Sequence, residues 1–241
     1  ADIGMVQVGN EITNGMLDIM PDYSKGETYK DTWGNAKNAK ILCGYLKAGI
    51  KAVRECTPKA LVTLHLESMG YGKCSEIMNA WERNGVDYDV FGSSFYHFWQ
   101  GNSSKNALAG LQKIENLAKS RGKMYAVMET SWLNSLKDAD GTSNVIGEGH
   151  ANAKVYSDDP QGQVDALTDM YQTLLSNDNG LGAFYWEGAW IPVKAGWTNW
   201  KYNKDMSDRY GTGWAAQGAK GYYPDNKMYY NGQPAWGGSS W

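Results

Sequence analysis

Two glutamates in this sequence each follow a short apolar run, and such a pair can carry out acid–base and nucleophilic chemistry. Glu11 follows the run at 6–10, VQVGN, and Glu129 follows the run at 124–128, MYAVM. A carboxylate at the end of an apolar strand is costly unless it is used, because burial without partners disfavours the charged form. Glycoside hydrolysis requires two carboxyl groups on either side of one sugar–sugar bond, and a spacing of roughly 5–5.5 Å favours a covalent intermediate with retention of configuration.

The neighbours of the two glutamates indicate a role for each. Asn10 precedes Glu11 and can hold a sugar hydroxyl, which favours Glu11 as the acid/base. Tyr96 ends another apolar run and can donate a hydrogen bond that keeps Glu129 ionised and oriented for attack. The alternative is that each glutamate is an ordinary residue at the start of a loop. The combination of Asn-Glu, a second Glu and Trp186 at three strand ends favours catalysis.

Aromatic and polar residues at the other strand ends are candidates for sugar binding. The chain has 11 Trp and 16 Tyr against 4 Phe, and Trp and Tyr combine a flat apolar face with a polar edge that suits a sugar ring. The alternative is that many of them fill the core. The candidate sugar-binding residues, besides Asn10 and Tyr96, are His65, Trp99, Trp186, Glu187 and Trp190. A hydrogen-bonded core histidine is an equally good interpretation of His65.

Alternating strands and helices must position these residues. The patterns predict strands at 5–8, 60–66, 88–96, 124–128 and 183–186, and helices at 33–56, 75–84, 105–120 and 163–175. Such alternation predicts an α/β fold with a parallel sheet. Long, acid-bearing loops after the strands and short turns before them are typical of a (β/α) barrel with its site at one end. Five strands, however, are fewer than the eight of a closed barrel.

Charge and composition exclude other classes of partner. The formal net charge is −3, and no Lys/Arg cluster indicates a surface that follows a phosphate backbone. No stretch is apolar enough to span a membrane. We therefore expect neither nucleic acid nor a membrane as a partner, and we treat residues 1–241 as one catalytic domain with no required cofactor.

Four stretches resemble glycoside hydrolase family 53, the endo-β-1,4-galactanases of a large clan of retaining barrel enzymes. They are VQVGNEITNGML, DVFGSSFYHFW, YAVMETSW and GAFYWEGAWIPV. The resemblance implies that Glu11, with Asn10 before it, is the acid/base that closes the fourth strand, and that Glu129 is the nucleophile that closes the seventh. It places Trp186 on the eighth strand. The chain then corresponds to strands four to eight of a (β/α)8 TIM barrel, and another segment must supply strands one to three.

The same resemblance implies the biological setting and a possible metal. The expected substrate is the β-1,4-galactan side chains of pectin, the (arabino)galactans, and the expected location is extracellular. The loop at 138–152 is rich in oxygen ligands of the kind that Ca²⁺ prefers, although its spacing is not that of an EF-hand. Family members that hold calcium in this loop use a His-x-Asn pair, which His150-Ala151-Asn152 resembles, and Glu148 is a third candidate ligand. A solvated polar loop is an equal alternative.

Two other functions remain open from the sequence. The chain could belong to another β-glycanase of the same clan that acts on mannan, xylan or glucan. It could also be a non-catalytic carbohydrate-binding fragment, since five strands do not close a barrel. Activity on a panel of polysaccharides distinguishes a galactanase from the other β-glycanases. The effect of Glu11→Gln on binding and turnover distinguishes an enzyme from a binding fragment.

Overall fold

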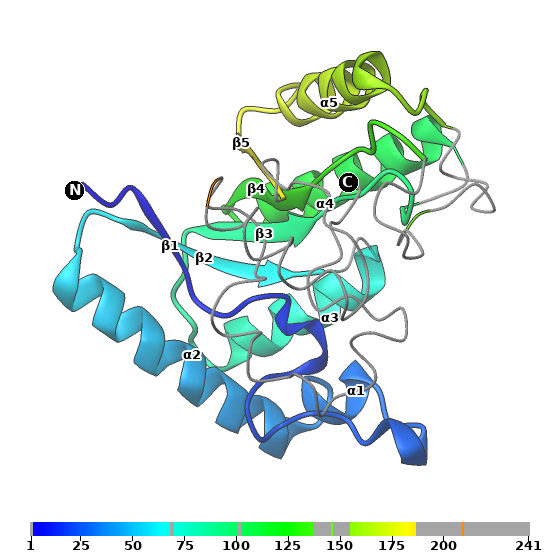
Figure 1. Ribbon diagram of the computed structural model, residues 1–241. Coiled ribbons are helices and arrows are strands. Elements are labelled where there is room, and N and C mark those ends of the chain that lie inside the picture. Colours follow the sequence, from blue (N-terminus) through cyan, green and yellow to red (C-terminus); the bar gives the residue numbers. More distant parts are fainter. Residues whose placement is uncertain are drawn as a thin grey trace. The chain divides into compact units, whose positions relative to one another are not determined.

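The strands form one parallel sheet in chain order. The computed structural model describes residues 2–67, 70–100, 103–136, 146, 155–186 and 209. The sheet has the order β1-β2-β3-β4-β5 (Figure 1), and its strands are β1 (Met5–Gln7), β2 (Leu61–Leu66), β3 (Val90–Ser94), β4 (Met124–Thr130) and β5 (Gly180–Tyr185). Because all four neighbouring pairs are parallel, the carboxyl ends of the strands share one edge of the sheet.

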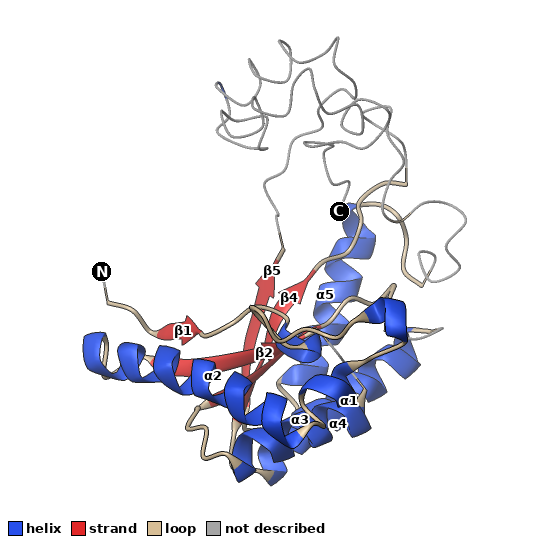
Figure 2. Cartoon of the chain, turned by 90° about the horizontal axis from the view of Figure 1, so that it is seen from below, coloured by secondary structure: helices blue, strands red, loops and turns tan. Residues whose placement is uncertain are grey.

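Helices connect these strands. They are α1 (Tyr29–Thr32), α2 (Ala36–Cys56), α3 (Tyr71–Arg83), α4 (Ser104–Ser120) and α5 (Pro160–Leu174), with short 3-10 helices η1 (Ile12–Asn14) and η2 (Tyr23–Lys25) after β1. Figures 1 and 2 show α2, α3 and α4 together on one side of the sheet. None of the described helices is both long and apolar enough to cross a bilayer. The predicted alternation of strands and helices is thus confirmed.

The chain divides into two compact units. The first contains residues 1–130 and 168–185, and the second contains 131–167 and 186–241. All five strands and α1 to α4 belong to the first unit, as do both glutamates singled out above.

The boundaries of several elements differ from the expected ones, and for α2 a capping residue explains the difference. The predicted helix 33–56 begins only at Ala36, because the Asn35 side chain accepts the backbone N–H groups of Lys37 and Asn38 and so caps α2. α3 begins at Tyr71, four residues before the predicted position 75. Strand β4 continues through Thr130, which makes Glu129 part of the strand and not the first residue after it.

Aromatic residues fill the layer between the sheet and the helices. Trp81 of α3 is fully buried, and its ring lies 5.9 Å from Trp33, 5.4 Å from Tyr88 and 6.2 Å from Phe91, measured between centroids. Phe91 of β3 in turn lies 6.2 Å from Tyr125 of β4. Aromatic contacts at these distances stabilise a core beyond the area they bury. These aromatic residues therefore belong to the core, as the alternative interpretation of the composition held.

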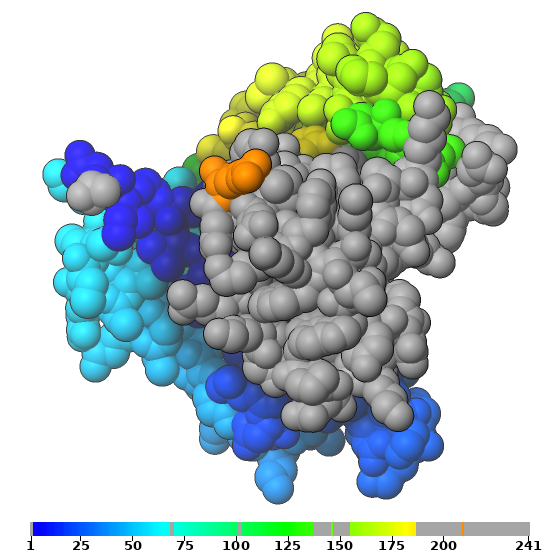
Figure 3. All heavy atoms as spheres, in the orientation of Figure 1, coloured from blue at the N-terminus to red at the C-terminus, as the bar shows by residue number. Residues whose placement is uncertain are grey.

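The segment that carries Glu11 is held against the helices. The indole N–H of Trp33 donates to the carbonyl of Ile12 at 2.9 Å, which fixes the turn after Glu11. Before that turn, the Val8 side chain packs closely on Gly49 of α2. A Cβ at Gly49 would lie 2.8 Å from Val8 Cγ1. In Figure 3 the blue spheres of the amino-terminal segment accordingly lie on the lighter blue and cyan spheres of α2 and the residues after it.

Candidate active site

The structure brings Glu11 and Glu129 together at the carboxyl edge of the sheet. Glu11 follows β1, and Glu129 lies near the end of β4. One carboxylate oxygen of each, together with one ring nitrogen of His65, all lie within 4.8 Å of one another. Two carboxyl groups this close, on non-adjacent strands, have the spacing of a retaining glycosidase and leave no room for the separate water of an inverting one.

Glu11 adopts a backbone conformation that is uncommon for a residue with a side chain. Its φ of 48° and ψ of 48° lie in the left-handed helical region. Such a conformation costs of order 1 kcal/mol or more and persists where surrounding contacts hold it. Gly9, two residues earlier, has φ 83°, and a Cβ there would lie 2.7 Å from the Ile12 side chain. The chain therefore turns sharply after β1 and points the Glu11 side chain along the edge of the sheet.

A β-bulge turns Glu129 into the site. Tyr125 of β4 faces the helix layer, where it contacts Phe91, and strict alternation would place residues 127 and 129 on that same face. The pairing instead shifts from Ser93↔Val127 to Ser94↔Glu129, which leaves Met128 as the extra residue. A bulge of this kind re-aims the next side chain. Glu129 thus faces the same side as Ser94 and Tyr96, where the Tyr96 hydroxyl donates to Glu129 Oε2 at 3.0 Å.

The small residue opposite the bulge makes room for it. A Cβ at Gly92 would lie 2.5 Å from Met128 Cγ and 3.1 Å from Thr63 Cγ2. The Met128 side chain therefore occupies the space over Gly92, on the face of the sheet opposite the helix layer. Overpacking this contact would displace Met128 and with it the neighbouring Glu129.

His65 and Ser94 lie behind Glu11. The Ser94 hydroxyl donates to Glu11 Oε1 at 2.5 Å and contacts His65 Nε2 at 2.9 Å. His65 Nδ1 lies 3.4 Å from the backbone nitrogen of Glu11 and 3.2 Å from Asn10 Oδ1. Burial lowers the pKa of His65 to about 4, so the ring is neutral at pH 7. Both ring nitrogens have polar protein neighbours, and this arrangement fits a hydrogen-bonded carboxylate site better than a metal centre.

The remaining predicted residues fall into three groups. Asn10 is exposed beside Glu11, and its Oδ1 accepts a hydrogen bond from Gln7 Nε2 at 3.0 Å. The side chain of His65 is fully buried, which agrees with the core-histidine interpretation. Trp99 and Trp186 are 50% and 39% exposed. Five predicted residues lie outside the described part of the chain: the possible metal ligands Glu148, His150 and Asn152 and the sugar-binding candidates Glu187 and Trp190.

Sequence reasoning missed Ser94. Serine carries no chemical signal by itself, and this one lies inside an apolar strand between Ser93 and Phe95. Its register could have indicated it, because Ser94 is two residues before Tyr96 and so shares its face. The bulge at Met128 has no such signal, since the run at 124–128 reads as an ordinary strand.

Comparisons with known proteins agree on one family. The family model described as "Glycosyl hydrolase family 53" matches residues 1–227. A Bacillus subtilis protein named "Endo-beta-1,4-galactanase" is 37% identical over 227 residues, which are 93% of this chain and 48% of that protein. A Thermothelomyces thermophilus protein named "Arabinogalactan endo-beta-1,4-galactanase" is 29% identical over 78% of this chain and 52% of its own length. The chain therefore spans about half the length of these relatives.

A solved structure gives the same result for the fold. The "Ignisphaera aggregans GH53 catalytic domain" matches with a TM-score of 0.65 and 31% sequence identity, over 78% of this chain and 49% of that one. The predicted fold, an α/β half of a TIM barrel, is thus confirmed.

Proposed function

Because this chain belongs to glycosyl hydrolase family 53, we propose that it supplies the catalytic carboxylates of a retaining endo-β-1,4-galactanase. The observation that carries the proposal is the approach of Glu11 and Glu129, whose oxygens lie within 4.8 Å of each other and of His65. Support for galactan as the substrate comes from the names of the two relatives, which are galactanases.

The reaction follows from the two carboxyl groups. Glu11 in its acid form protonates the oxygen of the departing sugar while Glu129 attacks the anomeric carbon, so that the bond between the two sugars breaks and a glycosyl ester of Glu129 forms. Glu11, now a carboxylate, then removes a proton from water, which displaces Glu129 and restores both groups. The hydroxyl of Tyr96, 3.0 Å from Glu129 Oε2, holds the nucleophile in place before the attack.

Other residues of the chain would hold the sugars. Asn10 is exposed next to Glu11 and would bind the hydroxyl adjacent to the anomeric carbon, a contact that tightens in the transition state. The indole rings of Trp99 and Trp186 suit the flat side of a galactose ring by their chemistry, and Trp190 and Glu187 are further candidates.

The proposal includes three more strands, a metal ion and a location. A closed barrel has eight strands, and β1 and β5 are the outer strands of this sheet of five, so we propose that three more strands complete the site. The resemblance of His150-Ala151-Asn152 to the calcium-binding pair of some family members supports a structural Ca²⁺ held by Glu148, His150 and Asn152, which a fall in melting temperature on chelation would test. Action on pectin side chains outside the cell follows from the same substrate assignment.

The decisive experiment measures hydrolysis by the protein that carries the complete barrel. We expect cleavage of β-1,4-galactan, with the β-anomer as the first product seen by NMR. Cleavage of mannan, xylan or glucan with none of galactan would overturn the substrate assignment, and an α-anomer as first product would overturn the mechanism.

Chemical rescue separates the two carboxylates. Glu11→Ala with azide and an activated substrate should release β-galactosyl azide, because the activated group departs without an acid and azide then attacks the glycosyl ester without needing a base. Glu129→Ala with azide and an activated substrate should release α-galactosyl azide, because azide then replaces the nucleophile. A binding module that is not an enzyme would turn over no substrate, and its sugar affinity would be unchanged in Glu11→Gln.

A further inference from the structure

The Glu11 side chain is held by a closed ring of polar contacts that begins and ends on Glu11 itself. From Glu11 Oε1 the ring passes to the Ser94 hydroxyl at 2.5 Å, then to His65 Nε2 at 2.9 Å. It returns from His65 Nδ1 to the backbone N–H of Glu11 at 3.4 Å. The three residues come from the ends of β1, β2 and β3. Both the carboxyl group and the strained backbone of Glu11 are therefore tied to the same pair of residues.

The number of protons in this ring decides the direction of each hydrogen bond. Ser94 has one hydroxyl proton, and the carboxylate oxygen at 2.5 Å is a stronger and closer acceptor than the imidazole nitrogen at 2.9 Å. Ser94 therefore donates to Glu11, and its oxygen must accept from His65. Because burial lowers the pKa of His65 to about 4, the ring carries one proton at pH 7, and that proton is on Nε2. Nδ1 is then free to accept the Glu11 backbone N–H.

The other neighbour of Nδ1 favours the opposite tautomer. Gln7 Nε2 donates to both the Gly9 carbonyl and Asn10 Oδ1, each at 3.0 Å, which identifies the latter atom as oxygen. A proton on Nδ1 could donate to that oxygen at 3.2 Å. In this tautomer Nε2 has no proton and must accept a hydrogen bond from Ser94. The Ser94 hydroxyl would then point towards His65 and leave Glu11 Oε1 without its donor. In one tautomer Glu11 Oε1 accepts a hydrogen bond from Ser94, and in the other it does not. The two tautomers can therefore be told apart.

We propose that Ser94 and His65, the latter as the neutral Nε2–H tautomer, are positioning residues that reserve Glu11 Oε2 for proton transfer to the sugar. Oε1 is the Glu11 oxygen that accepts from Ser94 among the described residues, so Oε2 is the one left to exchange a proton with the departing oxygen. The ring also holds the left-handed backbone at Glu11, with φ 48°, that aims this oxygen. This inference rests on the proposed function, because it assigns the proton-transferring oxygen of the acid/base.

The kinetic test compares substrates that need an acid with substrates that do not. A sugar leaving group requires protonation by Glu11, whereas a dinitrophenolate leaving group departs without it. In the complete barrel, Ser94→Ala should lower kcat/KM for galacto-oligosaccharides by about 10- to 100-fold. It should change glycosylation by a dinitrophenyl β-galactobioside by less than about threefold. An equal loss on both substrates would contradict the proposal, because it would mean general damage to the site.

Two further variants distinguish positioning from packing. Ser93→Ala is the matched control, since Ser93 is equally buried in the same strand but its hydroxyl contacts the Tyr125 hydroxyl at 2.5 Å on the helix side. It should leave the ratio of the two rates unchanged. Combined with Glu11→Gln, Ser94→Ala should cause no additional loss on the oligosaccharide, because both variants remove the same function. Additive losses would show that Ser94 acts elsewhere.

A spectroscopic measurement tests the ring without any substrate. Nitrogen-15 NMR of the three histidines, assigned by the loss of one signal pair in His65→Gln, should show His65 neutral at pH 7 with the proton on Nε2. A proton on Nδ1, or on both nitrogens, would overturn the proposed ring. If the protein cleaved no galactan, the proposed function would fail, but this measurement would still decide whether Ser94 donates to Glu11.

Discussion

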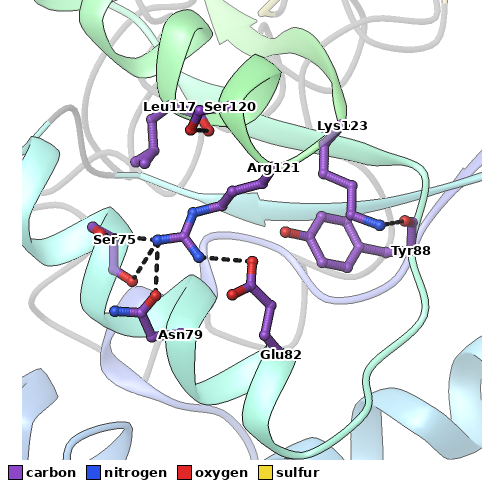
Figure 4. A network of polar contacts seen from close by, with 8 residues as sticks. All are labelled: Ser75, Asn79, Glu82, Tyr88, Leu117, Ser120, Arg121 and Lys123. Atoms are coloured by element: carbon purple, nitrogen blue, oxygen red, sulfur yellow. Dashed lines mark hydrogen bonds and ion pairs between the residues drawn. The ribbon is translucent and has the colours of Figure 1, made fainter.

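The two ends of the sheet use similar polar side chains for different purposes. At the amino end of β4, Arg121 donates to Asn79 Oδ1 at 2.8 Å, to Ser75 Oγ at 2.9 Å and to Glu82 Oε1 at 2.7 Å, and so ties α4 to α3 (Figure 4). Nearby, Lys123 donates to the Tyr88 carbonyl at 2.6 Å. Both of these cations meet acceptors, and their contacts hold helices and strands together.

A second pair at the amino end shows the same compensation of charge. Arg54 Nη1 lies 2.9 Å from Asp89 Oδ2, which also accepts the backbone N–H of Val62 at 2.7 Å. Burial alone would raise the pKa of Asp89, but the hydrogen bonds from Arg54 and Val62 outweigh it and hold this pKa below its usual value. At the carboxyl end, by contrast, two carboxylates approach each other and one has a strained backbone. The comparison indicates that stability is concentrated at the amino end and reactivity at the carboxyl end.

Among tests of this comparison, Glu129→Gln should have the largest effect. An amide cannot attack the anomeric carbon, so kcat on galactan should fall by at least about 10³-fold. The Tyr96 hydroxyl keeps an acceptor in the variant, and the free energy of unfolding should therefore change by less than about 1 kcal/mol. Release of reducing ends and urea unfolding measure the two quantities. A loss of stability as large as the loss of activity would mean that Glu129 holds the fold.

The buried histidine should make stability depend on pH. The pKa of His65 is about 4 in the folded protein against 6.5 for an unperturbed histidine, so between these values the unfolded chain binds a proton that the folded one does not. Stability should accordingly rise from pH 4 to pH 6.5, by about 3 kcal/mol from this residue. Urea unfolding at several pH values should show a smaller rise in His65→Gln, and an unchanged rise in Arg121→Met. A rise of the same size in His65→Gln would assign it to other groups.

The sequence indicated which strand ends carry the two glutamates, but not how the structure aims the second one. The strand ends at Glu11 and Glu129 were identifiable, because apolar runs that stop at a carboxylate are visible in one dimension. The re-aiming of Glu129 was not, because it depends on a register shift against β3 that only the paired strands reveal. Helix boundaries differed for a local reason, such as the cap at Asn35. The core role of Trp81 and Tyr125 was ambiguous because their composition suits both a core and a sugar site.

Gly92→Ala tests whether the bulge aims the nucleophile. The new methyl group would lie 2.5 Å from Met128 Cγ, so Met128 must move. We expect a loss of about 1–3 kcal/mol in stability and a fall in kcat that exceeds the fall in substrate affinity. Gly110→Ala in α4 is the control, because nothing lies within 4 Å of a Cβ there. It should stabilise the protein by about 0.5–1 kcal/mol. Normal kcat in Gly92→Ala would show that Glu129 does not depend on this contact.

Arg121→Met tests the amino end of the sheet and should have the smallest effect on turnover. The Arg121 side chain is 14% exposed, and its loss leaves the acceptors of Ser75 and Asn79 without their charged donor. The expected cost is about 1–3 kcal/mol of unfolding free energy, with kcat unchanged while the protein remains folded. Lys119→Met is the matched control, because its pair with Asp178 is 47% and 82% exposed, and it should cost less than about 1 kcal/mol. A clear fall in kcat for Arg121→Met would mean that the two ends of the sheet are coupled, and that the fastening of α4 to α3 extends its influence to Glu129 through β4.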